Sequence, residues 1–443
     1  MESGLLGALR LIVGAEHVLT GDGAPEAVVL PGTAAEVSRV LAAANAAGVP
    51  VYPRGAGSNP DGAAAPRGGI VLALTRMNRI LEIDTANLIA VAEPGVAVGE
   101  LNRAVAEYGL LYPPDPGTAA AATLGGTVSA NAGGLRGLKY GEAKHYIMGL
   151  EVVLADGRIL NTGGKTVKDV AGYDLTKLVT GAAGTLGVVT RVTVKLVPAP
   201  EARQVMLAAF ASLDDAGAAM AAMFAAKVIP AALEIMDNAT VKAVEAYAPA
   251  GLPTDAAAVL LVEVDGIAAA VAQEGAKAAE ALTANRATLR VAADAAERDA
   301  LWAVRRAARP ALAGLRPTLL AADATVPRSR VADMVRAVNA IAARHDVAIA
   351  TFGHAGDGSL YPTVGCDGGD EAELERVGRA MDEVFAAALE LGGTLAGGCG
   401  DDGLRYTEKR LGPAGLAAMR AVKKALDPNC ILNPGKLVGE WSR

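Results

Sequence analysis

The sequence of 443 residues has few cysteines, few aromatic residues and no long apolar run, and these shortages exclude several classes of protein. The three cysteines (Cys366, Cys399 and Cys430) are scattered, which excludes a disulfide framework and a Cys-x-x-Cys cluster for iron–sulfur or zinc. No stretch approaches the roughly eighteen apolar residues of a membrane span, and the first residues lack the features of a signal peptide. We therefore expect a cytoplasmic protein that is not an integral membrane protein; attachment to a membrane through a partner stays open.

Positive charge does not predominate: 41 lysines and arginines stand against 48 acids, which gives a formal net charge of −7, and no basic block stands out. This balance argues against nucleic acid as a partner. Apolar residues make up 52% of the chain and charged residues 20%, which is typical of a folded protein rather than a disordered one. The chain is too long for one hydrophobic core, so we expect two or three domains.

A glycine loop, Pro53-Arg54-Gly55-Ala56-Gly57-Ser58, follows the apolar run 49–52. Two glycines one residue apart allow a tight turn with unobstructed N–H groups, which is the geometry that binds a pyrophosphate, and Arg54 adds a charge. Taken alone the signal is weak, since many such loops bind nothing. The segment 113–134 consists mostly of small residues and cannot build a core. It suits backbone that lies against a large flat ligand, with a flexible loop as the alternative.

The first half of the chain has the β-α-β order of a nucleotide-binding fold. Strands are predicted at 27–31 and 49–52, and a capping box of Thr33 and Glu36 begins the helix between them. The glycines after residue 52 do not open a helix as a Rossmann fingerprint requires, which argues against a nicotinamide cofactor. Further predicted elements are strands at 70–74 and 88–93, a helix at 98–108 and a hairpin turn at Asp156-Gly157.

A domain boundary is expected near residue 200, where prolines end an alternating strand. Apolar strands then alternate with Ala-rich helices, which predicts an α+β domain with its helices on one face of an antiparallel sheet. These strands are expected at 206–210, 259–264, 288–292, 319–325 and 347–352.

Many ordered motifs identify a family. They are the loop 53–58, Asp115-Pro116, Thr123-Leu124-Gly125-Gly126, Asn131-Ala132-Gly133-Gly134, Lys139-Tyr140-Gly141, 169–175, 184–190, Trp302-x-x-Arg305, Asp323-x-x-Val326-Pro327, 353–358 and 432–436. Together they resemble the FAD-linked oxidases with a vanillyl-alcohol oxidase (PCMH-type) FAD domain, in the branch of the glycolate oxidase large subunit and D-lactate dehydrogenase. The resemblance implies a two-part PCMH-type FAD-binding domain over 1–200. It also implies a ferredoxin-like antiparallel-sheet substrate domain over 201–443, whose last residues return to the FAD domain.

The resemblance also implies which residues bind FAD. The loop 54–58 would hold the pyrophosphate, and Ser58 stands where some relatives bond FAD through a histidine, so we expect non-covalent FAD. The full expected set is Pro53, Arg54, Gly55, Ala56, Gly57, Ser58, Pro116, Thr123, Leu124, Gly125, Gly126, Ala130, Asn131, Gly133, Gly134, Tyr140, Gly184, Gly187, Val188, Val189 and Asn433.

On the substrate side the resemblance implies oxidation of a 2-hydroxy acid, with hydride passing from C2 to flavin N5. Arg305 matches the arginine that pairs with the substrate carboxylate; the alternative is a surface arginine on a helix that also carries Arg306 and Arg309. The remaining catalytic candidates are His354, Tyr361 and Cys399. His354 is either a base or a merely hydrogen-bonded histidine.

The sequence departs from the family at the metal site. Tyr361 and Ser359 replace the second histidine and the asparagine of the first ligand motif, and Gly398 and Cys399 replace a glutamate and a histidine of the second. One remaining ligand cannot hold a metal, so we expect none. The adjacent acids Asp401 and Asp402 offer carboxylates but are more often solvated in such a loop.

Three functions are compatible with these residues. The first is an FAD-dependent 2-hydroxy-acid dehydrogenase that passes electrons to an iron–sulfur or electron-transfer flavoprotein partner subunit. The second is an FAD-binding electron-transfer or structural subunit of a glycolate-oxidase-like complex that has lost its own chemistry. The third, a binding protein without flavin, conflicts with the intact N-terminal motifs.

Overall fold

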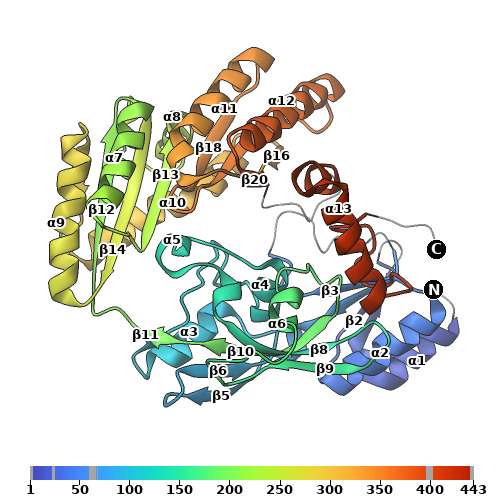
Figure 1. Ribbon diagram of the computed structural model, residues 1–443. Coiled ribbons are helices and arrows are strands. Elements are labelled where there is room, and N and C mark those ends of the chain that lie inside the picture. Colours follow the sequence, from blue (N-terminus) through green and yellow to red (C-terminus); the bar gives the residue numbers. More distant parts are fainter. Residues whose placement is uncertain (1–2, 22–24, 59–65, 67, 396–402, 440–443) are drawn as a thin grey trace. The chain divides into compact units, whose positions relative to one another are not determined.

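The computed structural model describes residues 3–21, 25–58, 66, 68–395 and 403–439 (Figure 1). The chain gathers into two compact units. Unit 1 comprises Met1–Gly134, Gly141–Ala199 and Gly398–Arg443, and unit 2 comprises Leu135–Tyr140 and Pro200–Gly397. Both helices and strands contribute throughout, so the predicted α+β class is confirmed.

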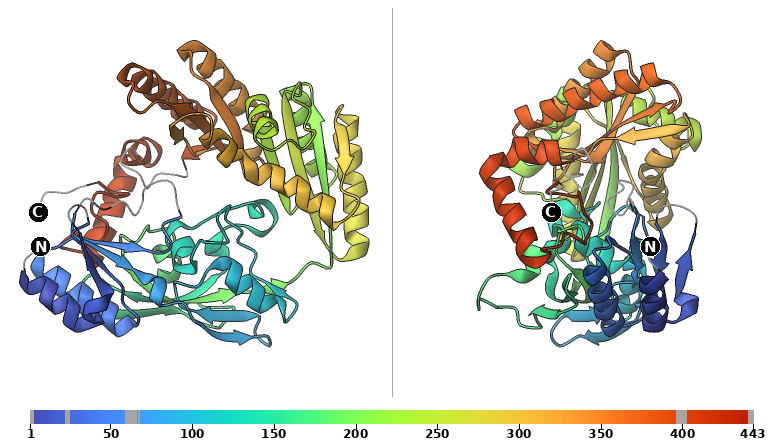
Figure 2. Two further views of the ribbon diagram at one scale, coloured as in Figure 1. Left: turned by 180° about the vertical axis from the view of Figure 1, so that it is seen from behind. Right: turned by 90° about the vertical axis from the view of Figure 1, so that its right-hand side faces the viewer.

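The first part of unit 1 is built on a small sheet of β1 (Val18–Thr20), β2 (Ala27–Val29), β4 (Ile70–Ala73) and β3 (Val51–Arg54). Strands β2, β4 and β3 are parallel, and β1 is antiparallel to β2. Helices α1 (Ser3–Val13) and α2 (Ala34–Ala47) lie side by side and share a core with these strands (Figures 1 and 2).

The start of α2 differs in one detail from the predicted capping box. The Thr33 side chain accepts a hydrogen bond from the backbone N–H of Glu36, as expected. The Glu36 carboxylate accepts instead from the N–H of Gly32, 2.7 Å away, rather than from Thr33. The helix end is therefore satisfied by a shifted version of the motif.

The second part of unit 1 is an antiparallel sheet of five strands in the order β5-β6-β10-β8-β9. Their bounds are β5 Ile80–Asp84, β6 Ile89–Ala92, β10 Val188–Lys195, β8 Ile147–Val153 and β9 Ile159–Gly163. The hairpin predicted at Asp156-Gly157 joins β8 to β9, and Gly157 has the positive φ of 87° that the turn requires. A short ladder pairs β7 (Leu110–Leu111) with β11 (Val197–Pro198), and short helices connect the strands: α3 Val98–Ala106, α4 Leu124–Ala130 and α6 Leu175–Val179.

The C-terminal helix α13 (Gly403–Leu426) packs within unit 1 through a buried lysine. The Lys423 Nζ atom donates to the carbonyl oxygens of Thr185 and Leu432, each 2.7 Å away, and pairs with Asp427 at 2.5 Å. Asp427 also accepts from the backbone N–H groups of Ile431 and Leu432. Because a buried charge needs such partners, this cluster fixes the chain that follows α13 to the turn before β10.

Unit 2 is organised by an antiparallel sheet of nine strands in the order β15-β12-β14-β13-β18-β19-β17-β20, with β16 pairing β19. Their bounds are β12 Ala202–Phe210, β13 Ala232–Asp237, β14 Ala258–Gly266, β15 Thr288–Val291, β16 Thr318–Ala321, β17 Ala324–Thr325, β18 Ile349–His354, β19 Ser359–Cys366 and β20 Thr394–Leu395.

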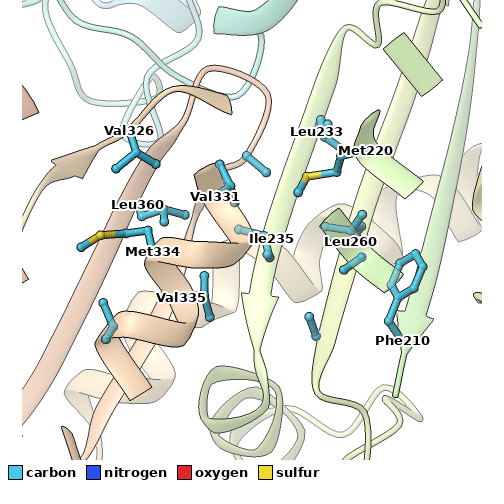
Figure 3. Packing of buried hydrophobic residues seen from close by; sticks show 14 of the residues in the cluster. Phe210, Met220, Leu233, Ile235, Leu260, Val326, Val331, Met334, Val335 and Leu360 are labelled. Carbon is cyan, nitrogen blue, oxygen red and sulfur yellow. The ribbon is translucent and has the colours of Figure 1, made fainter. Parts of the chain in front are cut away.

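Helices cover both faces of this sheet, so the prediction of helices on one face is wrong. On one face α7 (Leu213–Ala225), α9 (Ala268–Ala284), α11 (Val331–His345) and α12 (Glu371–Glu390) share a core with the strands. Figure 3 shows Val331 and Val335 of α11 beside Ile235 of β13, and Figure 2 shows α11 and α12 side by side.

The opposite face is covered by α8 (Asn238–Tyr247) and α10 (Ala295–Ala313). It buries alternate residues of the same strands, including Val205, Leu207, Val259 and Leu261. These strands carry continuous apolar runs, which is the pattern of a sheet buried on both faces. At one end this second face changes from apolar to charged, and the candidate substrate residues lie there.

Candidate functional site

Glu234 is the centre of the charged end of the second face. It stands on β13 between Leu233 and Ile235, and its side chain is buried. One carboxylate oxygen accepts from Nε of Arg305 at 2.8 Å, and the Nδ1 atom of His354 lies 2.8 and 2.9 Å from the two oxygens. A buried carboxylate with two such partners fixes the orientation of both.

Arg305 reaches Glu234 from α10 and is only 7% exposed. Its guanidinium carbon lies 4.9 Å from the centre of the Phe352 ring. Arg306 and Arg309 on the same helix are exposed. The interpretation of Arg305 as a surface arginine is therefore wrong, because its turn of the helix faces the sheet.

His354 ends β18, and its electrostatics are set by its neighbours. Burial alone would lower the pKa of the ring, but the charge of and hydrogen bond to Glu234 outweigh it and raise the pKa. Because a carboxylate accepts, the neutral ring carries its hydrogen on Nδ1, and Nε2 is the basic nitrogen. His354 is thus oriented as a base would be.

Tyr361 and Asp357 complete this group. The Tyr361 ring lies edge-on to the His354 ring, with 5.5 Å between centroids. Burial, together with the charges of neighbouring acids, raises the pKa of Tyr361 well above its usual range, so the phenol keeps its proton. Burial also raises the pKa of Asp357, whose Oδ1 accepts from the N–H of Ser359 at 2.9 Å.

Two further buried carboxylates, Glu263 and Asp265, stand on the neighbouring strand β14. Glu263 accepts a hydrogen bond of 2.7 Å from the indole N–H of Trp302. Asp265 pairs with Lys139 at 2.6 Å and accepts from the Tyr140 hydroxyl at 2.8 Å. Burial and the hydrogen bond to Asp265 raise the pKa of Tyr140. Each buried acid on this face therefore has its own donors.

Only part of the family's metal position lies within the described residues, so the expectation of no metal stays a prediction. His354 directs Nδ1 at Glu234, and the described part of the chain holds no group of three or more His, Cys, Asp or Glu that could bind a metal. The predicted residues Cys399, Gly398, Asp401 and Asp402 lie outside the described residues.

In unit 1 the glycine loop after β3 lies against the start of α4. A Cβ atom on Gly55 would overlap Oγ1 of Thr123, so only glycine allows this approach. The Thr123 Oγ1 atom is buried and has no hydrogen-bond partner among the described residues. The hydroxyls of Ser58 and Thr118 are 3.5 Å apart, which brings the loop to the small-residue segment.

Asn433 lies beside β3, the strand that leads into the same loop. Its Nδ2 donates to the carbonyl of Ala183 at 2.7 Å, and its backbone N–H donates to Val51. Its Oδ1 is buried without a partner among the described residues. A Cβ atom on Gly184 would lie 3.1 Å from Asn433 Nδ2 and 3.4 Å from Pro53. Unpartnered buried polar atoms beside crowded glycines suit a polar cofactor that lies along main chain.

Other predicted FAD residues are placed by local contacts of unit 1. Gly125 donates its N–H to the carbonyl of Pro94, and Asn131 caps α4 with a positive φ of 47°. A Cβ atom on Gly134 would overlap the carbonyl of Asp115, before Pro116. The remaining residues Arg54, Ala56, Gly57, Leu124, Gly126, Ala130, Gly133, Gly187, Val188 and Val189 also lie in unit 1. Tyr140 belongs to unit 2, where its hydroxyl bonds Asp265.

Sequence reasoning missed Glu234, Glu263 and Asp265, and it quoted Asp357 only as part of the motif 353–358. Acidic residues inside the apolar strands β13 and β14 were the available signal for the first three, because a charge in a buried strand needs a partner elsewhere in the chain. The sequence does not say which partner, since Glu234 meets residues 71 and 120 positions away.

Comparison with known proteins decides the family. A model of FAD binding domains matches residues 25–163, and a model of FAD-linked oxidase C-terminal domains matches residues 199–437. The chain belongs to the FAD-linked oxidases. The predicted resemblance is confirmed, FAD is the cofactor, and the protein is an FAD-dependent oxidoreductase.

Two relatives align over almost the whole chain. A glycolate oxidase subunit GlcD of Bacillus subtilis is 48% identical over 424 residues, which are 95% of this chain and 90% of that protein. A D-lactate dehydrogenase of Archaeoglobus fulgidus is 36% identical over 417 residues, covering 93% of this chain and 91% of that protein.

A solved structure of p-cresol methylhydroxylase with substrate bound shares the fold. Its TM-score is 0.81 at 19% identity, and the match covers 99% of this chain and 96% of that one. Within the described residues, no helix has both the length and the apolar content that crossing a membrane requires.

Proposed function

We propose that this chain is an FAD-dependent dehydrogenase that oxidises a small 2-hydroxy acid of the glycolate or D-lactate type. Relatives named for glycolate and D-lactate chemistry support the substrate class. The observation that carries the proposal is the buried contact of Arg305 and His354 with one carboxylate, Glu234. Glu234 thus holds Arg305, which binds the substrate carboxylate, and His354, which accepts the proton, in fixed positions relative to each other.

Unit 1 is the FAD domain, and it holds the cofactor without a covalent bond. The loop 54–58 offers backbone N–H groups to the pyrophosphate, and Ser58 cannot form the histidine link of some relatives. Thr123 Oγ1 and Asn433 Oδ1, both buried without a partner among the described residues, flank this loop and offer hydrogen bonds to the cofactor. Small residues in 113–134 allow main chain to approach the flavin ring.

Unit 2, the substrate domain, binds the hydroxy acid through Arg305. Since Nε already donates to Glu234, the terminal nitrogens of the guanidinium pair with the substrate carboxylate as a fork. His354 takes the hydroxyl proton at Nε2, because Glu234 holds the other ring nitrogen. When bound, FAD supplies the hydride acceptor for C2 of the substrate.

Electrons leave the protein through a separate acceptor. The three scattered cysteines supply no iron–sulfur cluster, so an iron–sulfur or electron-transfer flavoprotein subunit is the partner proposed. The GlcD relative is itself named as a subunit. We also propose a cytoplasmic location, with any membrane attachment supplied by the partner.

Turnover with an artificial dye acceptor tests the substrate class. Glycolate and D-lactate are compared with their methyl esters, which keep the hydroxyl and lack the carboxylate. We expect the free acids to be oxidised and the esters to lose most of kcat/KM, because Arg305 pairs with the charge. Equal rates for acid and ester would contradict the proposal. No turnover of any 2-hydroxy acid, with normal flavin reduction by dithionite, would favour an FAD subunit without its own chemistry.

A further inference from the structure

A short strap, Leu135–Tyr140, belongs to unit 2 although the chain on either side of it belongs to unit 1. Its last four residues form α5 (Gly137–Tyr140). The flanking residues Gly134 and Gly141 have φ of 155° and 84°, a region that favours glycine. The sequence thus permits a sharp turn at each end of the strap.

Asp265 fixes one side of the strap to the sheet. The Lys139 Nζ atom lies 2.6 Å from Asp265 Oδ1 and 2.5 Å from the Asp265 carbonyl oxygen. The Tyr140 hydroxyl donates to Asp265 Oδ2 at 2.8 Å. The Asp265 side chain is fully buried, so both of its oxygens are satisfied by donors from the strap. Removing either donor leaves a buried charge short of partners, which couples strap and sheet.

The other side of the strap meets the turn that follows His354. A Cβ atom on Gly137 would lie 2.6 Å from Asp357 Oδ2, and one on Gly356 would lie 2.7 Å from Leu138 Cβ. Gly358 closes this turn by donating its N–H to the carbonyl of His354 at 2.9 Å. The N–H of Gly356 also donates to the carbonyl of Leu233 at 2.9 Å, so a displaced strap removes one of the contacts that hold the main chain next to the proposed base.

We propose that Asp265 is a positioning residue. Through Lys139 and Tyr140 it holds the strap against residues 354–358, and so keeps His354 and Asp357 in place for the hydroxy acid. The inference rests on the proposed function of unit 2 and adds to it a positioning role for Asp265 on β14, a strand that carries none of the proposed catalytic residues. Asp265 acts only through the strap.

Hydrogen exchange tests whether Asp265 holds the strap. The variants are Lys139→Met and Asp265→Asn, with Lys139→Arg as the conservative replacement. The matched control is Lys165→Met, which removes an exposed lysine paired with Glu82 at 2.5 Å. We expect amides of 135–141 and 354–358 to exchange about 10-fold faster in the first two variants and unchanged in the control. Unchanged exchange in Lys139→Met and Asp265→Asn would overturn the proposal.

Kinetics test what the strap does for the site. We expect Lys139→Met to lower kcat for the hydroxy acid about 10-fold at unchanged flavin content, because a misplaced base takes the hydroxyl proton less efficiently, and Lys139→Arg to restore kcat to within about threefold. Faster exchange with unchanged KM and kcat would show a strap without a positioning role. If no 2-hydroxy acid reduces the wild-type flavin, the proposed function fails and the positioning role with it, while exchange still decides whether Asp265 holds the strap.

Discussion

The Nδ1 atom of His354 lies 2.8 Å from Oε1 of Glu234, and the two residues meet from adjacent antiparallel strands. The pairing of Ile235 with Gly353 on these strands places Glu234 and His354 at the next position of the register. The sheet itself therefore sets this contact, and the proposed chemistry depends on it.

Replacement of Glu234 by glutamine tests the contact. We expect Glu234→Gln to lower kcat by about 100-fold, because an amide orients the ring less strongly and no longer favours the developing imidazolium. FAD content should stay unchanged, since Glu234 belongs to unit 2. Steady-state kinetics with the dye acceptor measure the effect.

The control for this variant is Glu263→Gln, on the neighbouring strand. Glu263 is equally buried but bonds Trp302 rather than His354. We expect a loss of stability with less than about a tenfold loss of kcat. Equal losses of kcat in the two variants would show that Glu234 has only a structural role.

Arg305→Lys tests the carboxylate fork. Lysine keeps the charge but cannot bond Glu234 and a substrate carboxylate in one plane, so we expect KM to rise by about 100-fold. Arg306→Lys, on the exposed side of α10, is the control and should change nothing. An unchanged KM in Arg305→Lys would contradict the role of Arg305 in binding the substrate carboxylate.

Gly55→Ala tests the cofactor loop. The added Cβ atom would overlap Thr123 Oγ1 and displace the loop, so we expect the purified protein to lose most of its FAD. Gly7→Ala is the control, because nothing lies within 4 Å of a Cβ atom there. The ratio of flavin absorbance to protein absorbance measures FAD occupancy. Full occupancy in Gly55→Ala would contradict the binding of FAD at this loop.

Asp237 predicts a pH dependence of stability. Burial raises its pKa to about 6, against hydrogen bonds from the N–H groups of Thr240 and Thr351. Because the folded pKa is raised, its stabilising contribution is present below about pH 4 and lost as pH rises through about 6. From pH 5 to pH 8 we expect this residue to lower the free energy of unfolding by about 1 kcal/mol.

Urea unfolding of wild type and Asp237→Asn at both pH values isolates this contribution. The asparagine does not titrate, so the difference in unfolding free energy between the two proteins should shift by about 1 kcal/mol in favour of the variant as pH rises. A difference that stays constant would mean that Asp237 ionises normally in the folded protein.

Chelation tests the expectation that no metal takes part. Dialysis against a chelator should change neither flavin content nor dye-linked turnover, because the described residues around His354 do not form a metal site. Metal analysis before and after dialysis is the measurement. A stoichiometric zinc or manganese ion whose removal abolishes turnover would contradict it.

The cofactor side was predictable because composition indicated a large flat ligand and the family resemblance identified that ligand as FAD. Backbone that approaches a flavin needs small residues, as in 113–134, for which a flexible loop was the alternative. The structure instead forms α4 within this segment, with Leu124 and Val128 buried. The crowded contact between Gly55 and Thr123 is the structural counterpart of that pattern.

The substrate side was predictable only in part. Arg305 and His354 were found through the resemblance. Glu234 and Asp265 were missed because the sequence of an apolar strand does not show which distant residue pairs with an acid inside it. The second helical layer was missed for a similar reason. Continuous apolar runs in the strands of unit 2 indicate burial on both faces, and α8 and α10 supply the cover.

Anaerobic reduction of the bound flavin tests the central claim most directly. Purified protein should be yellow. Glycolate or D-lactate added without oxygen or acceptor should bleach the flavin absorbance in one stoichiometric step. The Arg305→Lys variant should need a far higher concentration of the hydroxy acid for the same bleaching. A yellow protein that dithionite reduces but no 2-hydroxy acid bleaches would contradict the account.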